Sequence, residues 1–260
     1  MNQIIQNFKK YQPLLKELVV KDIKIRYRKS ILGVFWTLLN PLLMMVVLSV
    51  VFSNIFKFDI PNYPVYILSG QVIFTFFSEA TNTAMVSIIG NAALIKKVYI
   101  PKYNFPFAAI ISSMINVMAS FSALIIVMLF MRSELHFTML LSFIPILALV
   151  IFATGIGLIL AAYVVKFRDL MHFYGVFLTA LMYLMPVIYP MSILEGKMWI
   201  YNIVKYNPLT MMLDTFRDFV MYGTFPNWEH FLIIFGVAFA VLILGLWIFR
   251  RKQDTFILEI

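Results

Sequence analysis

The sequence predicts an all-α membrane protein whose residues 1–260 form a single transmembrane domain with six transmembrane helices. Three observations predict this fold class. Of the 260 residues, 62% are hydrophobic and only 13% are charged, against about 25% charged in soluble domains. Six segments are apolar over the roughly 20 residues that a membrane-spanning helix needs. Lys and Arg gather in alternate connections between these segments, as they do in membrane proteins.

The predicted spans are the six apolar runs of the chain, at 31–53, 65–90, 106–131, 138–165, 171–190 and 231–249. An even number of crossings puts both termini on one side. Sixteen of the 21 Lys and Arg lie in the N-terminal segment, the second and fourth loops and the tail 250–260. Because cytoplasmic loops carry the excess of Lys and Arg, both termini are predicted to be cytoplasmic. The net charge of +9 therefore reflects topology and contact with anionic lipid, not a nucleic-acid-binding surface.

A basic amphipathic segment, residues 13–29, precedes the first span. Pro13 suits the first position of a helix, and an apolar stripe that includes Leu18 and Ile23 lies apart from the lysines. The segment is expected to lie along the cytoplasmic face as an interfacial helix. Apolar and cationic residues alternate from Ile23 to Arg28, however, which also fits an extended strand. A simple interfacial anchor explains the segment as well as a functional element does.

Two connections differ from plain loops. NAALIKKVYIPK (91–102) is expected to form a short helix that Asn91 caps and a proline ends, either as an ordinary turn or as a docking element. The connection 191–230 is too apolar for a solvated loop and too often interrupted by charge for a full span. Two short helices broken at Asn207 and Pro208, re-entering the membrane from the extracytoplasmic side, fit it better. Such backbone persists only where protein or a water-filled cavity covers it.

Glu79 is an acidic residue well inside a predicted span. A carboxylate there is costly, so it should face the bundle interior or a cavity and pair with a neighbour. Both a role in a transport pathway and a structural hydrogen bond between helices would explain it. Gly155 and Gly157, also inside a span, are expected to permit close helix packing.

No motif in the sequence indicates catalysis. It contains no HExxH, no GxSxG and no Walker A pattern, and no cysteine that would provide a thiolate or a disulfide. The three histidines lie far apart in the sequence, so no metal site is predicted. The chain is expected not to be an enzyme, with an intramembrane glycosyltransferase or hydrolase as the rival class.

The order of these parts resembles a known family of membrane proteins. The block LVVKDIKIRYRKSILGVFWTLLNPLLMMVVLSVVF, six spans and the re-entrant block YNPLTMMLDTFRDFV are similar to the permease subunits of bacterial ATP-binding-cassette exporters for O-antigen, teichoic acid and capsular polysaccharide. The resemblance covers essentially the whole chain. It implies a type-2 exporter fold, a homodimer in the bacterial cytoplasmic (inner) membrane, and a separate ATPase subunit that binds the ATP and Mg, with no cofactor on this chain. It also implies export of a glycan linked to undecaprenyl diphosphate.

The resemblance implies roles for four groups of residues. The lipid-diphosphate gate would comprise Arg26, Arg28 and Lys29. The glycan channel would be lined by aromatic residues of the first and fifth spans, namely Phe35, Trp36, Phe173, Tyr174, Phe177, Tyr183 and Tyr189. ATPase docking would use Lys16, Lys21, Lys96, Lys97 and Tyr99. The re-entrant segment is marked by Asn207, Pro208 and Arg217.

Each expected role has an alternative. The gate cations also fit a purely topogenic role, and each channel aromatic also fits packing in the core or against lipid. The same permease architecture exporting a smaller drug or natural product is the alternative function. A passive channel is a third.

Overall fold

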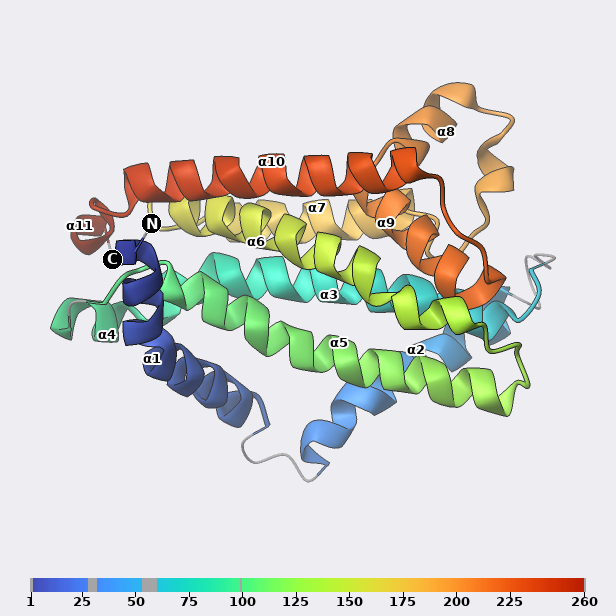
Figure 1. Cartoon of the computed structure of the whole chain (residues 1–260), viewed down its shortest axis with the longest axis horizontal. Coiled ribbons are helices and arrows are strands. Elements are labelled where there is room, and N and C mark those ends of the chain that lie inside the picture. The colour runs from blue at the N-terminus through green and yellow to red at the C-terminus, as the bar shows by residue number, and fades with distance from the viewer. Residues whose placement is uncertain (1, 28–31, 53–59, 99, 260) are drawn as a thin grey trace.

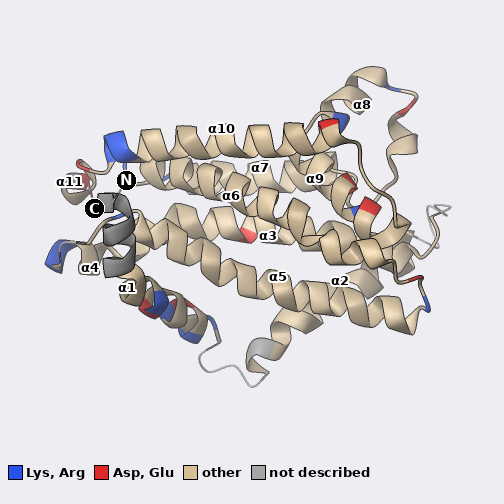
Figure 2. Cartoon of the chain, viewed as in Figure 1, with Lys and Arg blue, Asp and Glu red and all other residues tan. Residues whose placement is uncertain are grey.

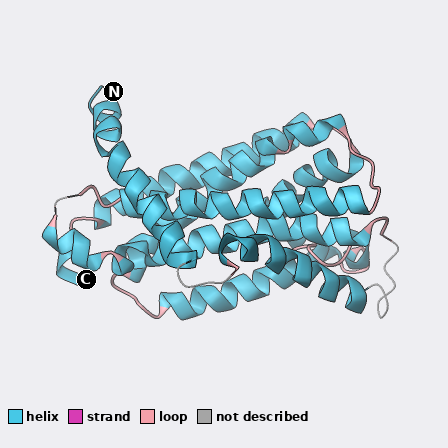
Figure 3. Ribbon diagram, turned by 90° about the horizontal axis from the view of Figure 1, so that it is seen from below, coloured by secondary structure: helices cyan, strands magenta, loops and turns pink. Residues whose placement is uncertain are grey.

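A computed structural model describes residues 2–27, 32–52, 60–98 and 100–259, and all regular structure in these ranges is helical (Figures 1 and 3). The α-helices are α1 (Asn2–Tyr27), α2 (Trp36–Val51), α3 (Tyr63–Gly90), α4 (Ala92–Lys97), α5 (Asn104–Phe130), α6 (Phe143–Val164), α7 (Leu170–Leu184), α8 (Met198–Lys205), α9 (Pro208–Arg217), α10 (Trp228–Lys252) and α11 (Phe256–Glu259). Short 3₁₀ turns at Gly33–Phe35, Phe137–Leu141 and Met191–Leu194 and a π-helical turn at Asp218–Tyr222 complete them.

Four of these segments are long and apolar enough to cross a membrane: Tyr63–Gly90, Asn104–Phe130, Phe137–Val164 and Trp228–Lys252. They agree with four of the six predicted spans, and the chain is a multi-pass membrane protein. The first and fifth predicted spans correspond to the shorter apolar helices Trp36–Val51 and Leu170–Leu184. The fifth helix ends before Pro186, whose ring removes a backbone N–H and opposes continued helix.

Helix α3 lies in the middle of the bundle, with α5 on one side and α6 on the other (Figure 1). Packing between α6 and α10 depends on Gly155, because a Cβ there would lie 2.6 Å from the α10 backbone at Val241 and Leu242. Gly157 faces α3 instead, where a Cβ would lie 2.8 Å from the Cβ of Ala84. The close-packing interpretation of both glycines is confirmed.

Helix α1 runs obliquely across one end of the bundle, where α11 also lies (Figures 1 and 3). It is helical through Tyr27, so the alternative of an extended strand from Ile23 is wrong over the described part of that segment. Its apolar stripe packs on the bundle, and Leu18 is buried in a cluster with Ile95 and Phe105. The apolar stripe predicted from the sequence is therefore the surface that attaches α1.

The connection between α3 and α4 differs from the prediction in one detail. The short helix is present, but Asn91 does not cap it. The Asn91 amide donates instead to the carbonyl of Ser87, 2.8 Å away, while its oxygen accepts a hydrogen bond of 2.7 Å from Lys21 on α1. Asn91 thus ties α1 to the end of α3. Lys and Arg of α4 and of the end of α10 lie at this same end of the molecule (Figure 2).

At the opposite end, the chain between α7 and α10 forms two short helices, as predicted. Helix α8 ends at Lys205 and α9 begins at Pro208. The side chain of Asn207 caps α9 by accepting a hydrogen bond of 3.0 Å from the backbone N–H of Leu209. Helix α9 is largely buried against α3 and α6, whereas α8 projects from the bundle (Figure 1).

Candidate functional site

A cavity of about 630 Å³ lies between the end of α1 and the helices α2, α3, α5 and α7. Its wall combines apolar surface with amide, hydroxyl and charged groups, and consists of Arg26, Trp36, Thr37, Asn40, Pro41, Met44, Gln71, Phe74, Thr75, Glu79, Asn116, Ser120, Met182 and Val187. A volume in this range is typical of ligand pockets in proteins. Such polar lining is unusual inside an apolar bundle, which makes this cavity the candidate functional site.

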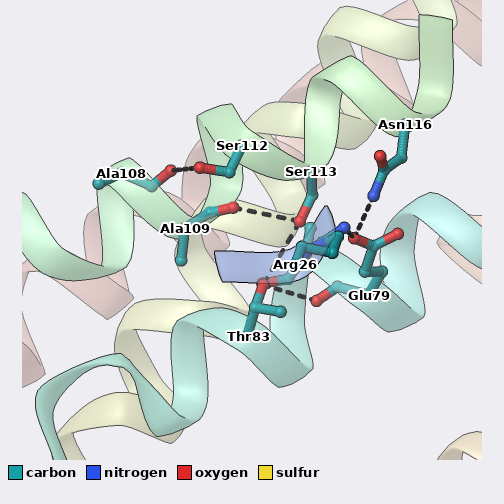
Figure 4. A network of polar contacts seen from close by, with 9 residues as sticks. Arg26, Glu79, Thr83, Ala108, Ala109, Ser112, Ser113 and Asn116 are labelled. Atoms are coloured by element: carbon teal, nitrogen blue, oxygen red, sulfur yellow. Dashed lines mark hydrogen bonds and ion pairs between the residues drawn. The ribbon is translucent and has the colours of Figure 1, made fainter. Parts of the chain in front are cut away.

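An ion pair forms one wall of the cavity. Arg26, from the last turn of α1, donates to Oε1 of Glu79 near the middle of α3, and the amide of Asn116 on α5 donates to the same oxygen (Figure 4). The side chains of Arg26 and Glu79 remain 31% and 24% exposed. The expectation that Glu79 faces a cavity and pairs with a neighbour is confirmed.

Hydroxyl groups of α3 and α5 continue this polar contact along the two helices (Figure 4). Thr83 donates to the backbone carbonyl of Glu79 at 2.7 Å, and its Oγ1 lies 3.4 Å from Oγ of Ser113. Ser113 in turn donates to the carbonyl of Ala109 at 3.1 Å. A second cavity, of about 390 Å³, adjoins this network and is also lined by Arg26. Arg26 is thus accessible from both cavities.

Gln71 and Asp22 add polar groups to the walls of the two cavities. Gln71 is 7% exposed, lines the larger cavity, and has no hydrogen-bond partner for its Oε1 among the described residues. Such an orphan acceptor is costly unless a bound group or water satisfies it. Asp22, one turn before Arg26 on α1, lines the smaller cavity. Burial raises the pKa of Asp22, an effect that nearby Lys21 and Arg26 partly oppose.

The aromatic residues expected to line a glycan channel are found in three environments. Trp36 lines the large cavity, and Tyr174 is buried, with its hydroxyl donating to Thr81 at 2.6 Å. Tyr189 is partly buried like a packing residue, and its hydroxyl donates to the carbonyl of Leu184 at 2.9 Å. The remaining four are exposed on α7 and just before α2, and these are Phe35, Phe173, Phe177 and Tyr183. Trp36 is thus the member of the group that meets the polar cavity.

The expected docking lysines all belong to elements at the end of the bundle shared by α1 and α4. Lys16, Lys96 and Lys97 are exposed, and so is Lys21 apart from its hydrogen bond to Asn91. Arg28, Lys29 and Tyr99 lie outside the described residues.

Among the described residues, no group of three His, Asp or Glu is placed to hold a metal ion.

Arg217, at the end of α9, has a different environment from Arg26. It is 2% exposed and donates to the carbonyls of Pro186, Tyr66 and Val187 at 2.8, 3.1 and 3.3 Å, and to Oγ of Ser69 at 3.1 Å. Its guanidinium carbon lies 3.5 Å from the centre of the Tyr66 ring. Arg217 therefore satisfies backbone carbonyls that the end of α7 leaves without helical partners, and it fixes this irregular segment to α3.

The sequence profile of the family described as "ABC-2 type transporter" matches residues 13–221. The chain belongs to the ABC-2 type transporter family. Its role is therefore in transport and not in catalysis.

Curated relatives of this ABC-2 type transporter are named for polysaccharide export. An O-antigen export system permease protein RfbA of Klebsiella pneumoniae is 31% identical over 249 residues, which covers 94% of this chain and 93% of the relative. A protein of the same name from Myxococcus xanthus is 26% identical over 98% of each chain. The polysialic acid transport protein KpsM of Escherichia coli is 23% identical over 93% of this chain and 94% of the relative.

In this ABC-2 type transporter, every residue that lines the large cavity falls within the range that the family profile matches. Sequence reasoning found Arg26, Trp36 and Glu79 but missed Asn116 and Gln71. An isolated amide side chain inside an apolar span was the signal available for both.

Proposed function

We propose that this chain is the transmembrane subunit of a bacterial ATP-driven exporter that moves a polysaccharide linked to undecaprenyl diphosphate across the cytoplasmic membrane. The similarity along almost the whole chain to permeases named for O-antigen export carries this proposal. Capsular polysaccharide and teichoic acid are further members of the same substrate class. The polar cavity inside the bundle supports a role in moving a hydrophilic group.

The proposed topology has six crossings with both termini in the cytoplasm. At 1.5 Å per residue, α2 and α7 are about 24 and 22 Å long, which is less than the roughly 30 Å of bilayer hydrocarbon. The non-helical residues 185–190 would extend the fifth crossing to full depth. Helices α8 and α9 would form the re-entrant pair, since Arg217 satisfies the carbonyls of that irregular backbone. The Lys and Arg at the α1 end support a cytoplasmic position for it.

Energy would come from a separate ATPase subunit, which would bind ATP and Mg, so this chain would bind no cofactor. The exposed Lys16, Lys96 and Lys97, together with Lys21 and Tyr99, would form the docking surface for that subunit. The four lysines lie on α1 and α4 at the same end of the bundle, which supports a shared surface.

A homodimer would enclose the translocation path. The four exposed aromatic side chains on α7 and before α2 support this arrangement, because a second copy would convert their lipid-facing surface into a channel wall. Trp36 would then connect that channel to the polar cavity.

The lipid diphosphate would be held by cations at the cytoplasmic side of the first crossing. Arg26 lines both cavities, and Arg28 and Lys29 follow it in the sequence. Guanidinium groups bind phosphate through paired hydrogen bonds, which suits this role. Replacing Arg28 and Lys29 together by Ala should impair export but leave membrane insertion intact, and unchanged export would remove them from the gate.

Deletion of the gene in its own bacterium tests the proposed function. We expect lipid-linked glycan to accumulate on the cytoplasmic side and surface glycan to fall, with recovery when the intact gene is returned. Unchanged surface glycan accompanied by new drug sensitivity would overturn the proposal in favour of the export of a smaller amphiphile.

A further inference from the structure

Arg26 meets an acidic partner within the protein. Its guanidinium donates to Glu79, and Asn116 donates to the same carboxylate oxygen. A carboxylate near the middle of a membrane helix is costly, and pairing with a cation offsets part of that cost. The pair is nevertheless incompletely buried, with Arg26 31% and Glu79 24% exposed. A second anion can therefore approach Arg26 without unfolding α1.

The space around the pair suits an anionic ligand. Cavities of about 630 and 390 Å³ are both lined by Arg26, which leaves room for a ligand beside its guanidinium. Asn116 and Arg26 together present N–H donors toward one point, which Glu79 now occupies (Figure 4). Converging N–H donors around an arginine fork are the arrangement that binds phosphate groups.

We propose that Glu79 is an internal counter-ion that occupies the anion site of Arg26 and Asn116 until a lipid diphosphate displaces it. This inference rests on the proposed function. It names Glu79 as the residue that regulates binding of the lipid diphosphate at the proposed gate. Phosphate oxygens take the place of the carboxylate on Arg26, and α1 is released from α3 at that contact.

The exchange sets a threshold for loading. A competing carboxylate lowers the affinity of Arg26 for every anion by the same factor, because the pair must first be broken. Phospholipid headgroups, which bind through a single phosphodiester charge, then fail to occupy the site. A diphosphate, with more charge and more acceptor oxygens, binds tightly enough to displace Glu79.

Direct binding of a short polyprenyl diphosphate tests the inference. The full chain, purified in detergent, is titrated with radiolabelled geranylgeranyl diphosphate, with geranylgeraniol and inorganic pyrophosphate as competitors that separate the lipid from the headgroup. Glu79→Gln keeps the shape and removes the charge, so we expect binding to become about three- to tenfold tighter. Arg26→Ala should weaken binding at least tenfold, alone and combined with Glu79→Gln.

Glu17→Gln is the matched control, because it removes the same charge from an exposed position on α1 that lines neither cavity. We expect Glu17→Gln to change the affinity less than twofold. Glu79→Asp, which keeps the carboxylate, should also remain close to the parent. Glu79→Ser provides a second neutral variant if Glu79→Gln fails to fold, which thermal unfolding of each variant would detect.

Equal or weaker binding by both neutral Glu79 variants would overturn the inference, and so would an equal gain from Glu17→Gln. Those results would leave the proposed export function intact. Binding that does not depend on Arg26 would remove the diphosphate gate itself, while the deletion experiment would still decide whether the chain exports a glycan.

Discussion

Replacement of Arg217 tests the structural role of the connection after α7. Its guanidinium makes four hydrogen bonds, three of them to backbone carbonyls, in a buried site. A buried acceptor that loses its donor costs about 1–3 kcal/mol. Removing the cation also removes the cost of burying it, which reduces the net loss. We therefore expect Arg217→Ala to destabilise the protein by about 3–5 kcal/mol, similar to breaking a buried charged interaction.

Arg217→Lys separates charge from geometry. Lysine keeps the cation but lacks the planar fork that reaches several carbonyls at once, so about 2–3 kcal/mol of the loss should remain. Thermal unfolding of the detergent-purified protein provides the assay. At about 2–4 °C per kcal/mol for a chain of this size, the Tm of Arg217→Ala should fall by at least 6 °C. Lys197→Ala, which removes an exposed cation from the same connection, is the control.

A Tm for Arg217→Ala within 1 °C of both the parent and Lys197→Ala would refute this reasoning, because a buried cation with four partners cannot be removed at no cost. A Tm for Arg217→Lys equal to the parent would show that the charge, and not the fork, holds the segment.

Three further predictions concern other contacts. Gly155→Ala should lower stability by about 1–3 kcal/mol because its Cβ would meet the α10 backbone, whereas Gly175→Ala has open space and should be neutral or stabilising; denaturation of both variants checks this. Tyr174→Phe removes one hydrogen bond between α7 and α3 and should lower stability by about 1 kcal/mol in the same assay. Replacing Lys96 and Lys97 by Glu should weaken ATPase co-purification, and normal recovery would contradict the docking role.

Hydropathy and backbone chemistry predicted much of the fold from the sequence. The four long spans follow from uninterrupted apolar runs, which are the strongest signal a membrane protein offers. The break between α8 and α9 followed from Asn207 and Pro208, because an Asn cap followed by Pro at the first position specifies a helix start locally. These features depend on residues adjacent in the chain.

The candidate site was only partly predictable, because its contacts join residues that are distant in the sequence. Glu79 was expected to have a neighbour, but nothing local identified Arg26, 53 positions away, as that neighbour. Asn91 looked like a helix cap, yet Lys21 and the end of α3 compete for its side chain. In the sequence, Tyr174 cannot be told apart from the other aromatic residues of α7, which are exposed. Its packing against α3, where its hydroxyl bonds to Thr81, buries it.

ATP-dependent transport of the glycan is the most direct test of the proposed function. Inside-out membrane vesicles containing this chain and its partner ATPase would be supplied with radiolabelled, undecaprenyl-diphosphate-linked glycan, and protection of the label from an added glycosidase would be measured. The account predicts protection that requires ATP and is lost without this chain. Protection without ATP would indicate a passive channel, and its absence under all conditions would contradict glycan export.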